Sequence, residues 1–370
     1  KINLTRGALH ITDDLIIDAP SQSIIIDAND LSRIFQVTHG GDANITVELH
    51  NLKLVDGRAE SGGAIQNEET LILDNVVLAS NVATGGFFDG GGAIVNRGNL
   101  IMQYCSLKQN RGGHEGGALW NRGGRVAIVF TSFIRNSSQS GGALSSDGGR
   151  VILDRTNLSN NSASRAGGAV VLRNATLSVT DSALFNNHGP AFGGAISANG
   201  GSLTFSSTML SNNRSSNSGS AIDGNNTAIT LTNSTVGNNA GAAFFSGALD
   251  STGGSLTLRN VTVAGTRDSA GIRIKGSTLT MSNSIVADSR GTFVRDITND
   301  GGTIIFQGNN LVEDGSVTGP GVITGNPLLG PLAENGGPTL TFLPQAGSPV
   351  IDAGDLAFAP NSPFDQRGPG

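Results

Sequence analysis

Two aspartates and one arginine lie at matching places of a repeated sequence and could act on a sugar. They are Asp223, Asp250 and Arg273, at successive spacings of 27 and 23 residues. Two carboxylates about 5 to 5.5 Å apart suit a retaining glycosidase, and an acid pair beside a basic residue suits a lyase that neutralises a uronate and removes its proton. Two alternatives stay open: an aspartate stack bridged by the arginine, or a calcium ion held by the two carboxylates.

The middle of the chain is basic, although the whole chain has a net charge of −6. Residues 97–173 carry 10 basic and 3 acidic side chains, whereas the segments before and after are acidic. The arginines fall in two columns of the repeat: Arg97, Arg122 and Arg173 share one column with Glu68 and Asp147, and Arg125 and Arg150 follow one strand later with no acidic residue between them.

These arginines predict a surface that attracts an acidic polymer, such as a uronic-acid glycan or a sulfated polysaccharide. The alternative is an ordinary salt-bridge ladder on a solvated face, where each exposed pair contributes about 0 to 1 kcal/mol. Trp120, the only tryptophan, is expected to point outwards beside the arginines. Sugar rings stack on exposed indoles, so Trp120 is a candidate glycan platform, although an indole packed under a neighbouring loop is the other interpretation. Tyr104 lies on a different bend and is left out of this site.

A repeat reveals the elements that would position these residues. The stretch "SGGAIQN" at Ser61 returns as "GGAIVN", "GGALWN", "GGALSS", "GGAVVL", "GGAISA", "GSAIDG" and "SGALDS". A period of 25 to 29 residues between copies indicates a solenoid, in which each unit buries its apolar face only against a neighbour. The alanines of the eight copies are Ala64, Ala93, Ala118, Ala143, Ala169, Ala195, Ala221 and Ala248.

Each repeat predicts three short strands and three bends. Aliphatic and polar residues alternate in stretches such as "LILDNVVLASN", which is typical of strands with one buried face. The adjacent glycines suit the sharpest corner because glycine tolerates positive φ. The asparagines that end each run, from Asn81 to Asn239, should stack and bond to neighbouring coils, as should a shorter column that begins at Asn67.

We therefore predict an all-β fold: a single right-handed parallel β-helix of about a dozen coils over residues 1–325. Residues 326–370 are rich in proline and glycine, which interrupt ladder hydrogen bonds. This segment is expected to fold over the end of the β-helix as an irregular cap, because an open terminal edge invites aggregation.

Composition excludes several classes of protein. Cys105 is the only cysteine, so no intrachain disulfide can form, and its alignment with small residues predicts a buried position. No run of about 18 apolar residues is present, so no transmembrane segment is expected, and any export signal is expected to precede Lys1. The histidines suggest no metal site, and neither a cofactor nor a nucleic-acid partner is expected. Asp352, Asp355 and Asp365 could gather around a cation.

Several motifs resemble known families. The "GGAI" repeats with a terminal asparagine, including "FIRN" at Phe133, resemble those of bacterial polymorphic outer-membrane proteins and related pectate-lyase-like β-helices. The stretches "NPLLGPL", "ENGGPT", "GSPVIDAGD" and "DQRG", between Asn326 and Gly368, look like the end of a choice-of-anchor Q domain. The resemblance implies a secreted or surface-attached bacterial β-helix protein. It implies no activity, because the superfamily contains lyases, hydrolases and adhesins.

The leading interpretation is an extracellular or cell-surface protein with a structural or adhesin-like role, whose partner is an anionic polysaccharide or cell-surface glycan. The alternative is a polysaccharide lyase or glycoside hydrolase that uses Asp223, Asp250 and Arg273. A deep groove at these three residues would favour the enzyme, and a smooth wall there would favour the binding protein. The sequence leaves the oligomeric state and the mode of anchoring open.

Overall fold

The chain is an all-β parallel β-solenoid of about twelve coils, which confirms the predicted fold class. The computed structural model describes residues 1–21, 24–41, 44–86, 89–241, 246–359 and 364–368. The chain divides into two compact units: unit 1 comprises residues 1–177 and 187–189, and unit 2 comprises residues 178–186 and 190–370. The regular structure of the described residues is β-strand, apart from a 3-10 helix η1 (Leu356–Phe358).

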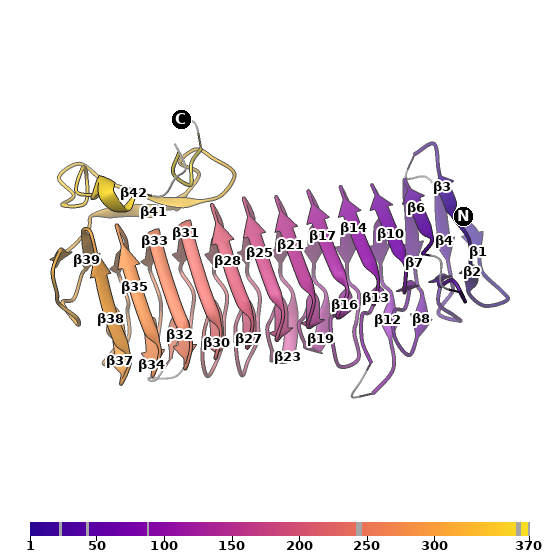
Figure 1. Ribbon diagram of the computed structural model, residues 1–370, viewed down its shortest axis with the longest axis horizontal. Helices are drawn as coiled ribbons and strands as arrows, with labels where there is room; N and C mark the ends of the chain where they lie inside the picture. Colours follow the sequence, from indigo (N-terminus) through magenta and orange to yellow (C-terminus); the bar gives the residue numbers. More distant parts are fainter. Residues whose placement is uncertain (22–23, 42–43, 87–88, 242–245, 360–363, 369–370) are drawn as a thin grey trace. The chain divides into compact units, whose positions relative to one another are not determined.

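One coil of unit 1 shows how a repeat folds. β13 (Ile94–Asn96) follows the repeat alanine, β14 (Asn99–Gln103) follows a turn, and β15 (Ser106–Lys108) follows a bend. Each pairs in parallel with its counterpart in the next coil, β16 (Leu119–Arg122), β17 (Arg125–Val129) and β18 (Ser132–Ile134). We call these three stacks of strands the first, second and third walls; the coils of unit 1 run from indigo to magenta in Figure 1.

The remaining strands of unit 1 belong to the same walls. The first wall also contains β2 (Leu9–Ile11), β5 (Phe35–Val37), β9 (Ile65–Asn67), β20 (Leu144–Asp147) and β24 (Val170–Arg173). The second wall contains β3 (Leu15–Asp18), β6 (Thr46–His50), β10 (Thr70–Asp74) and β21 (Arg150–Asp154), and β25 (Thr176–Thr180) begins in unit 1. The third wall contains β1 (Ile2–Asn3), β4 (Ile24–Asp27), β7 (Leu52–Val55), β11 (Val77–Ala79) and β22 (Asn157–Ser159). Two short pairs lie between walls: β8 (Arg58–Ala59) with β12 (Val82–Ala83), and β19 (Ser137–Ser140) with β23 (Ser162–Ala166).

Unit 2 repeats the arrangement with longer strands. Its first wall contains β27 (Ile196–Asn199), β30 (Ile222–Asn225), β32 (Gly247–Thr252), β34 (Ala270–Lys275) and β37 (Ile297–Asp300). β31 (Ala228–Gly237) and β33 (Ser255–Ala264) each run through both the second and third walls. The others are β26 (Ala183–Phe185), β28 (Ser202–Ser206), β29 (Met209–Ser211), β35 (Thr278–Ser282), β36 (Ile285–Ala287), β38 (Thr303–Gln307), β39 (Asn310–Val312) and β40 (Val322–Ile323).

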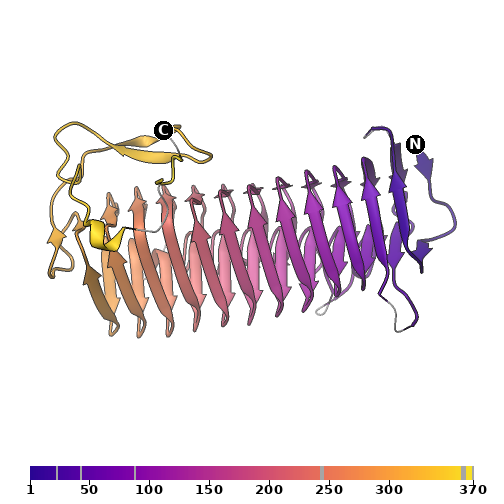
Figure 2. The same ribbon diagram turned by 45° about the horizontal axis from the view of Figure 1, so that its top comes forward.

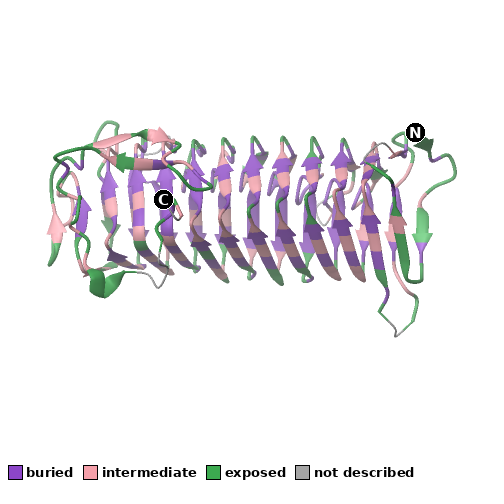
Figure 3. Cartoon of the chain, turned by 90° about the horizontal axis from the view of Figure 1, so that it is seen from above, coloured by how far each residue is buried: buried purple, intermediate pink, exposed green. Residues whose placement is uncertain are grey.

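Inward side chains form an apolar column on each wall. The eight repeat alanines are fully buried, and so are the aliphatic residues that follow most of them. Figure 3 shows the buried residues in purple along the strands and exposed residues in green at the bends. Cys105 is buried as predicted, and this burial raises the pKa of its thiol to about 12. The free thiol is therefore a small core residue rather than a nucleophile.

The repeat glycines form the corner that leads into the first wall, as predicted. The first glycine of each pair has positive φ, for example 60° at Gly62 and 50° at Gly116. The second glycine packs closely against the next coil: a Cβ on Gly117 would lie 1.9 Å from the carbonyl oxygen of Gly142. The first position therefore needs the glycine backbone, and at Gly117 the second position has no room for a side chain.

The predicted asparagine ladders are confirmed. In unit 1, the Nδ2 of Asn110 donates to the Oδ1 of Asn136 at 3.0 Å and to the carbonyl oxygen of Leu78 at 3.0 Å. The same pattern links Asn81, Asn110, Asn136, Asn161 and Asn187 in unit 1, and Asn213 to Asn239 in unit 2. The shorter column links Asn67 to Asn96 and Asn96 to Asn121. The amides satisfy buried backbone groups at bends where ladder bonding stops.

The C-terminal segment of unit 2 lies along the side of the coils. β41 (Leu329–Ala333) and β42 (Thr341–Pro344) form an antiparallel pair that Figure 2 shows in yellow beside the coils. Gln366 accepts a hydrogen bond from Thr235 at 2.7 Å, and Asn283 exchanges hydrogen bonds with Asp355. The polar bends of several coils thus hold the segment, and its expected position over the end of the β-helix stays a prediction. The boundary at residue 326 stays a prediction.

Candidate functional site

The first wall of unit 1 brings the predicted columns together. Register pairs Trp120 with Val95 and Ser145, and it pairs Asp147 with both Arg122 and Arg173. Arg97 lies at the same edge and pairs with Glu68 at 3.2 Å. The column of acidic and basic residues that the repeat predicts is therefore present on the wall.

Trp120 is buried, with 3% of its surface exposed, so the prediction of an exposed indole is wrong. Its Nε1 donates to the Oδ2 of Asp147 at 2.8 Å, and the guanidinium of Arg122 lies 4.5 Å from the ring centroid. The side chain points out of the coil but neighbouring groups cover it. Trp120 therefore positions Arg122 and Asp147, and it has no open face for a sugar ring.

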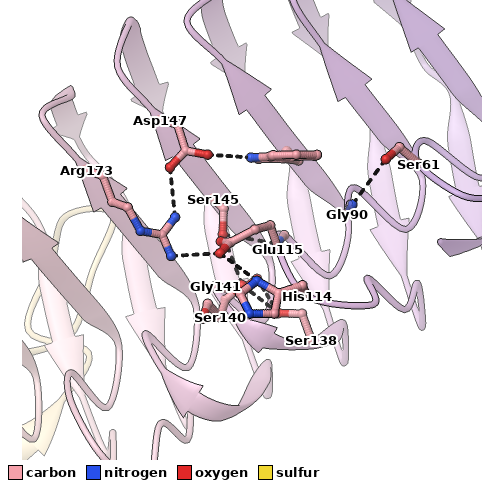
Figure 4. A network of polar contacts seen from close by, with 12 residues as sticks. Ser61, Gly90, His114, Glu115, Ser138, Ser140, Gly141, Ser145, Asp147 and Arg173 are labelled. Carbon is pink, nitrogen blue, oxygen red and sulfur yellow. Dashed lines mark hydrogen bonds and ion pairs between the residues drawn. The ribbon is translucent and has the colours of Figure 1, made fainter. Parts of the chain in front are cut away.

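A chain of ion pairs continues from Asp147. Arg173 donates to Asp147 at 2.8 Å and to the Oε1 of Glu115 at 2.7 Å, and the Nδ1 of His114 lies 3.0 Å from the same oxygen. Figure 4 shows Arg173 between the two carboxylates, with His114 beside Glu115. Burial opposes the charge of Arg173, but its two acidic partners outweigh this effect and raise its pKa. Arg173 is thus occupied by protein carboxylates.

Arg122, Arg125 and Arg150 are the other exposed arginines of the predicted surface, and of these Arg122 has Asp147 as its register partner on the next strand. Arg125 and Arg150 are direct register partners on β17 and β21, so they lie one coil spacing apart, about 4.8 Å. Within the described residues, none of these three guanidinium groups forms an ion pair. Two like charges held side by side on an open wall repel each other until an anion lies between them.

The predicted acidic column is present on the first wall of unit 2. Register aligns Ser197, Asp223, Asp250, Arg273 and Thr298 on successive strands. The Nη1 of Arg273 lies 3.4 and 3.5 Å from the two oxygens of Asp250, and its Nε donates to Asp300 at 2.8 Å. Ser218 donates to the Oδ1 of Asp223. The arginine therefore bridges Asp250 to Asp300, a residue that the alternatives drawn from the sequence do not include.

Burial dominates the ionisation of this column. It raises the pKa of Asp250 to about 6, because only 2% of the residue is exposed and because Asp223 repels the ionised form, while Arg273 limits the increase. Burial also raises the pKa of Asp223, against the hydrogen bonds from Ser218 and Ser197. A carboxyl group with a pKa near 6 can take up or release a proton close to neutral pH.

The two pockets that we describe lie elsewhere in unit 2, between the C-terminal segment and the coils. One of about 150 Å³ is lined by residues including Asn283, Leu311 and Val350, and the other of about 240 Å³ by Asn233, Asn260 and Arg367. The described residues contain no group of three or more His, Cys, Asp or Glu side chains that could hold a metal ion. A calcium ion at Asp223 and Asp250 stays a prediction. Among the described residues, no helix is long and apolar enough to cross a membrane.

Sequence reasoning missed two groups of residues. Glu115 contacts Arg173, which lies 58 positions away in the chain, and no local sequence pattern predicts that contact. Tyr104 and Phe130 stack with ring centroids 5.2 Å apart and an angle of 4° between the rings. Their separation of 26 residues equals one period of the repeat, so the sequence alone indicates that the two residues lie in adjacent coils.

No protein-family model matches this chain, and no curated protein matches it in sequence. Two solved structures are similar to it at 12% identity. Tailspike protein 3 of bacteriophage CBA120 has a TM-score of 0.33, with a match covering 80% of this chain and 57% of the tailspike. The A-module of the mannuronan C-5 epimerase AlgE4 of Azotobacter vinelandii has a TM-score of 0.26, with a match covering 86% of this chain and 91% of the module. Neither likeness assigns a site or an activity to this chain.

Proposed function

We propose that this protein is a non-catalytic, extracellular or cell-surface β-helix that binds an anionic polysaccharide through Arg122, Arg125 and Arg150. The observation that carries the proposal is the pairing of Arg125 with Arg150, two exposed arginines in register without a protein carboxylate between them. Trp120 supports the site by holding Arg122 at 4.5 Å. A polymer with one acid group per sugar can neutralise several such arginines at once.

The proposal narrows the predicted glycan-binding set, which is Trp120 and five arginines, to three arginines. Arg97 and Arg173 are already paired with Glu68, Asp147 and Glu115, so they contribute less to the attraction of a polyanion. The proposed extracellular location and surface attachment rest on the motifs that resemble the polymorphic outer-membrane-protein repeats and the choice-of-anchor Q domain. The coils themselves serve as a scaffold that holds the arginines in a fixed row.

Retention on immobilised heparin and on immobilised alginate tests the proposal. The variant Arg122→Gln, Arg125→Gln, Arg150→Gln is expected to bind about tenfold to a hundredfold more weakly, since each exposed contact contributes up to about 1 kcal/mol. It should elute at lower salt, because screening weakens exposed charge contacts. The matched control neutralises three exposed arginines of unit 2, Arg259, Arg267 and Arg295. Equal retention of the two triple variants would refute the site.

A second candidate function is a polysaccharide lyase or glycoside hydrolase at Asp223, Asp250 and Arg273. The observation that favours it is the pKa of about 6 at Asp250 beside an arginine. The side chain of Asp250 is 2% exposed and that of Arg273 is 14% exposed, so a substrate would have to displace their present contacts. Incubation of the protein with the same polysaccharides, followed by an assay for new unsaturated and reducing ends, decides between a binding protein and an enzyme. Cleavage that disappears in Asp250→Asn would favour the enzyme.

A further inference from the structure

The bend between the second and third walls holds a residue with left-handed φ in successive coils of unit 1. Asn51 and Asn75 occupy it with φ of 58° and 54°, as suits asparagine. The next three coils place Tyr104, Phe130 and Arg155 there, with φ of 53°, 47° and 46°. Bulky side chains are disfavoured in this conformation, so each of the three residues makes the folded state less stable than asparagine would at the same position.

The three side chains do not recover that cost through burial. Tyr104 is 57% exposed and Phe130 is 43% exposed, although both are large and apolar. The rings lie parallel at 5.2 Å, and the guanidinium carbon of Arg155 lies 5.0 Å from the centroid of Phe130. Phe130 is therefore covered on both faces, by Tyr104 and by Arg155. The other face of Tyr104 looks towards the coil of Asn75, whose side chain is shorter.

The second wall joins this stack to the unpaired arginines. Along the second-wall strands, the outward side chains next to the bend are Gln103, Val129 and Asp154. Two residues further from the bend are the half-buried Ile101, Ala127 and Ile152. The far edge of β17 and β21 carries Arg125 and Arg150. Five residues of strand separate Arg125 from Phe130, a distance of about 17 Å. The result is one face of the second wall, with aromatic rings and Asp154 along one edge, aliphatic side chains in the middle and unpaired cations along the other edge.

We propose that this face binds an acidic glycan, with a sugar ring stacked on the open face of Tyr104 and acid groups beside Arg125 and Arg150. The inference rests on the proposed function and identifies its binding face. A sugar chain matches the chemistry of this face because it presents flat C–H surfaces to aromatic rings together with regularly spaced acid groups. Aromatic residues exposed at a cost to the backbone are typical of a site retained for binding.

The variant Tyr104→Asn, Phe130→Asn separates binding from folding, because it installs the residue that Asn51 and Asn75 provide in the same bend. Its urea midpoint is expected to be unchanged or higher than that of the wild type. Its affinity for alginate oligosaccharides, measured by calorimetry, is expected to fall about tenfold or more. Its affinity for poly-L-glutamate, which carries carboxylates without sugar rings, should not change.

Two controls keep the outcomes distinct. Phe293→Asn removes an exposed phenylalanine of unit 2 that also has positive φ, 60°, and it should change neither affinity. The double variant Arg125→Gln, Arg150→Gln should bind both alginate oligosaccharides and poly-L-glutamate more weakly. If its affinity for neither ligand falls, the proposed function fails. The stacking site is refuted if the arginine variant binds both ligands more weakly while the asparagine variant keeps its affinity for both. It is also refuted if the asparagine variant loses affinity for both ligands equally. Self-association of the wild type that the asparagine variant abolishes would assign the stack to contacts between copies and also overturn the proposal.

Discussion

Trp120 in unit 1 and Asp250 in unit 2 occupy the same place of the repeat, two residues after the repeat alanine, and both are almost completely buried. Trp120 is neutral, and its charged neighbours Arg122, Asp147 and Arg173 lie at the partly exposed rim. At Asp250 the charge itself is buried, with a pKa of about 6. The comparison shows that the place in the coil decides the direction of a side chain, whereas its neighbours decide its exposure and ionisation.

The largest expected effect comes from emptying the site of Trp120. Trp120→Ala should lower the free energy of unfolding by about 3 to 5 kcal/mol, because a buried indole leaves a cavity. The loss should be similar at pH 5 and pH 8, since the contact is mainly apolar, and urea denaturation at both pH values measures it. Trp120→Phe is the matched control, which keeps the ring and removes the hydrogen bond to Asp147. A loss below about 1 kcal/mol for the alanine variant would contradict a packed indole.

The acidic column of unit 2 should instead show a pH-dependent stability. The folded pKa of Asp250 is about 6, above its ordinary value of 3.8. Between these values the folded chain holds a proton that the unfolded chain has released, so the free energy of unfolding falls as pH rises from about 4 to 6 and then levels off. The contribution is about 3 kcal/mol. Urea denaturation across this range should give a shallower slope for Asp250→Asn than for the wild type.

Asp296 provides the control for that slope, because burial also raises its pKa to about 6. Asp296→Asn should remove a separate contribution, and the double variant should be flatter than either single one. An unchanged slope in Asp250→Asn would show that Arg273 keeps Asp250 ionised throughout.

The smallest expected losses of stability concern Arg173 and Arg97, the two arginines of the predicted surface that pair with carboxylates. Arg173→Gln should cost about 2 kcal/mol, because Glu115, with only 5% of its side chain exposed, loses a charged donor at 2.7 Å. Arg97→Gln should cost less than about 1 kcal/mol, since Arg97 and Glu68 are each 37% exposed. Thermal or urea unfolding of the two variants measures the difference, and equal losses would remove the distinction between a buried and an exposed ladder.

Most of the fold could be predicted from the repeat. The glycine pairs, the repeat alanines and the column from Asn81 to Asn239 each report a local requirement of one coil: positive φ, a small buried side chain, or an amide at a bend. Because every coil meets the same requirement, the pattern recurs at the period and reveals the register. The alignment of Asp223, Asp250 and Arg273 follows from that register and is confirmed.

The site was less predictable because it depends on contacts that do not repeat. The cover over Trp120 and the pairing of Glu115 with Arg173 join residues from different coils and from irregular turns. The position of Tyr104 above Phe130 was visible as a spacing, but its exposure was not. Hydrogen bonds of Gln366 and Asn283 that span 72 or more residues hold the C-terminal segment on the coils.

The sequence by itself determined the solenoid, the register of the coils and the direction in which each column points, because periodic side chains must satisfy the same backbone geometry in every coil. Only the tertiary structure decided which outward residues stay in contact with solvent and which carboxylates keep their protons. Exposure and pKa depend on the local density of neighbouring atoms and charges, and these come from segments far apart in the chain. That is why Trp120 is buried while Tyr104 is exposed, and why Asp250 titrates near pH 6.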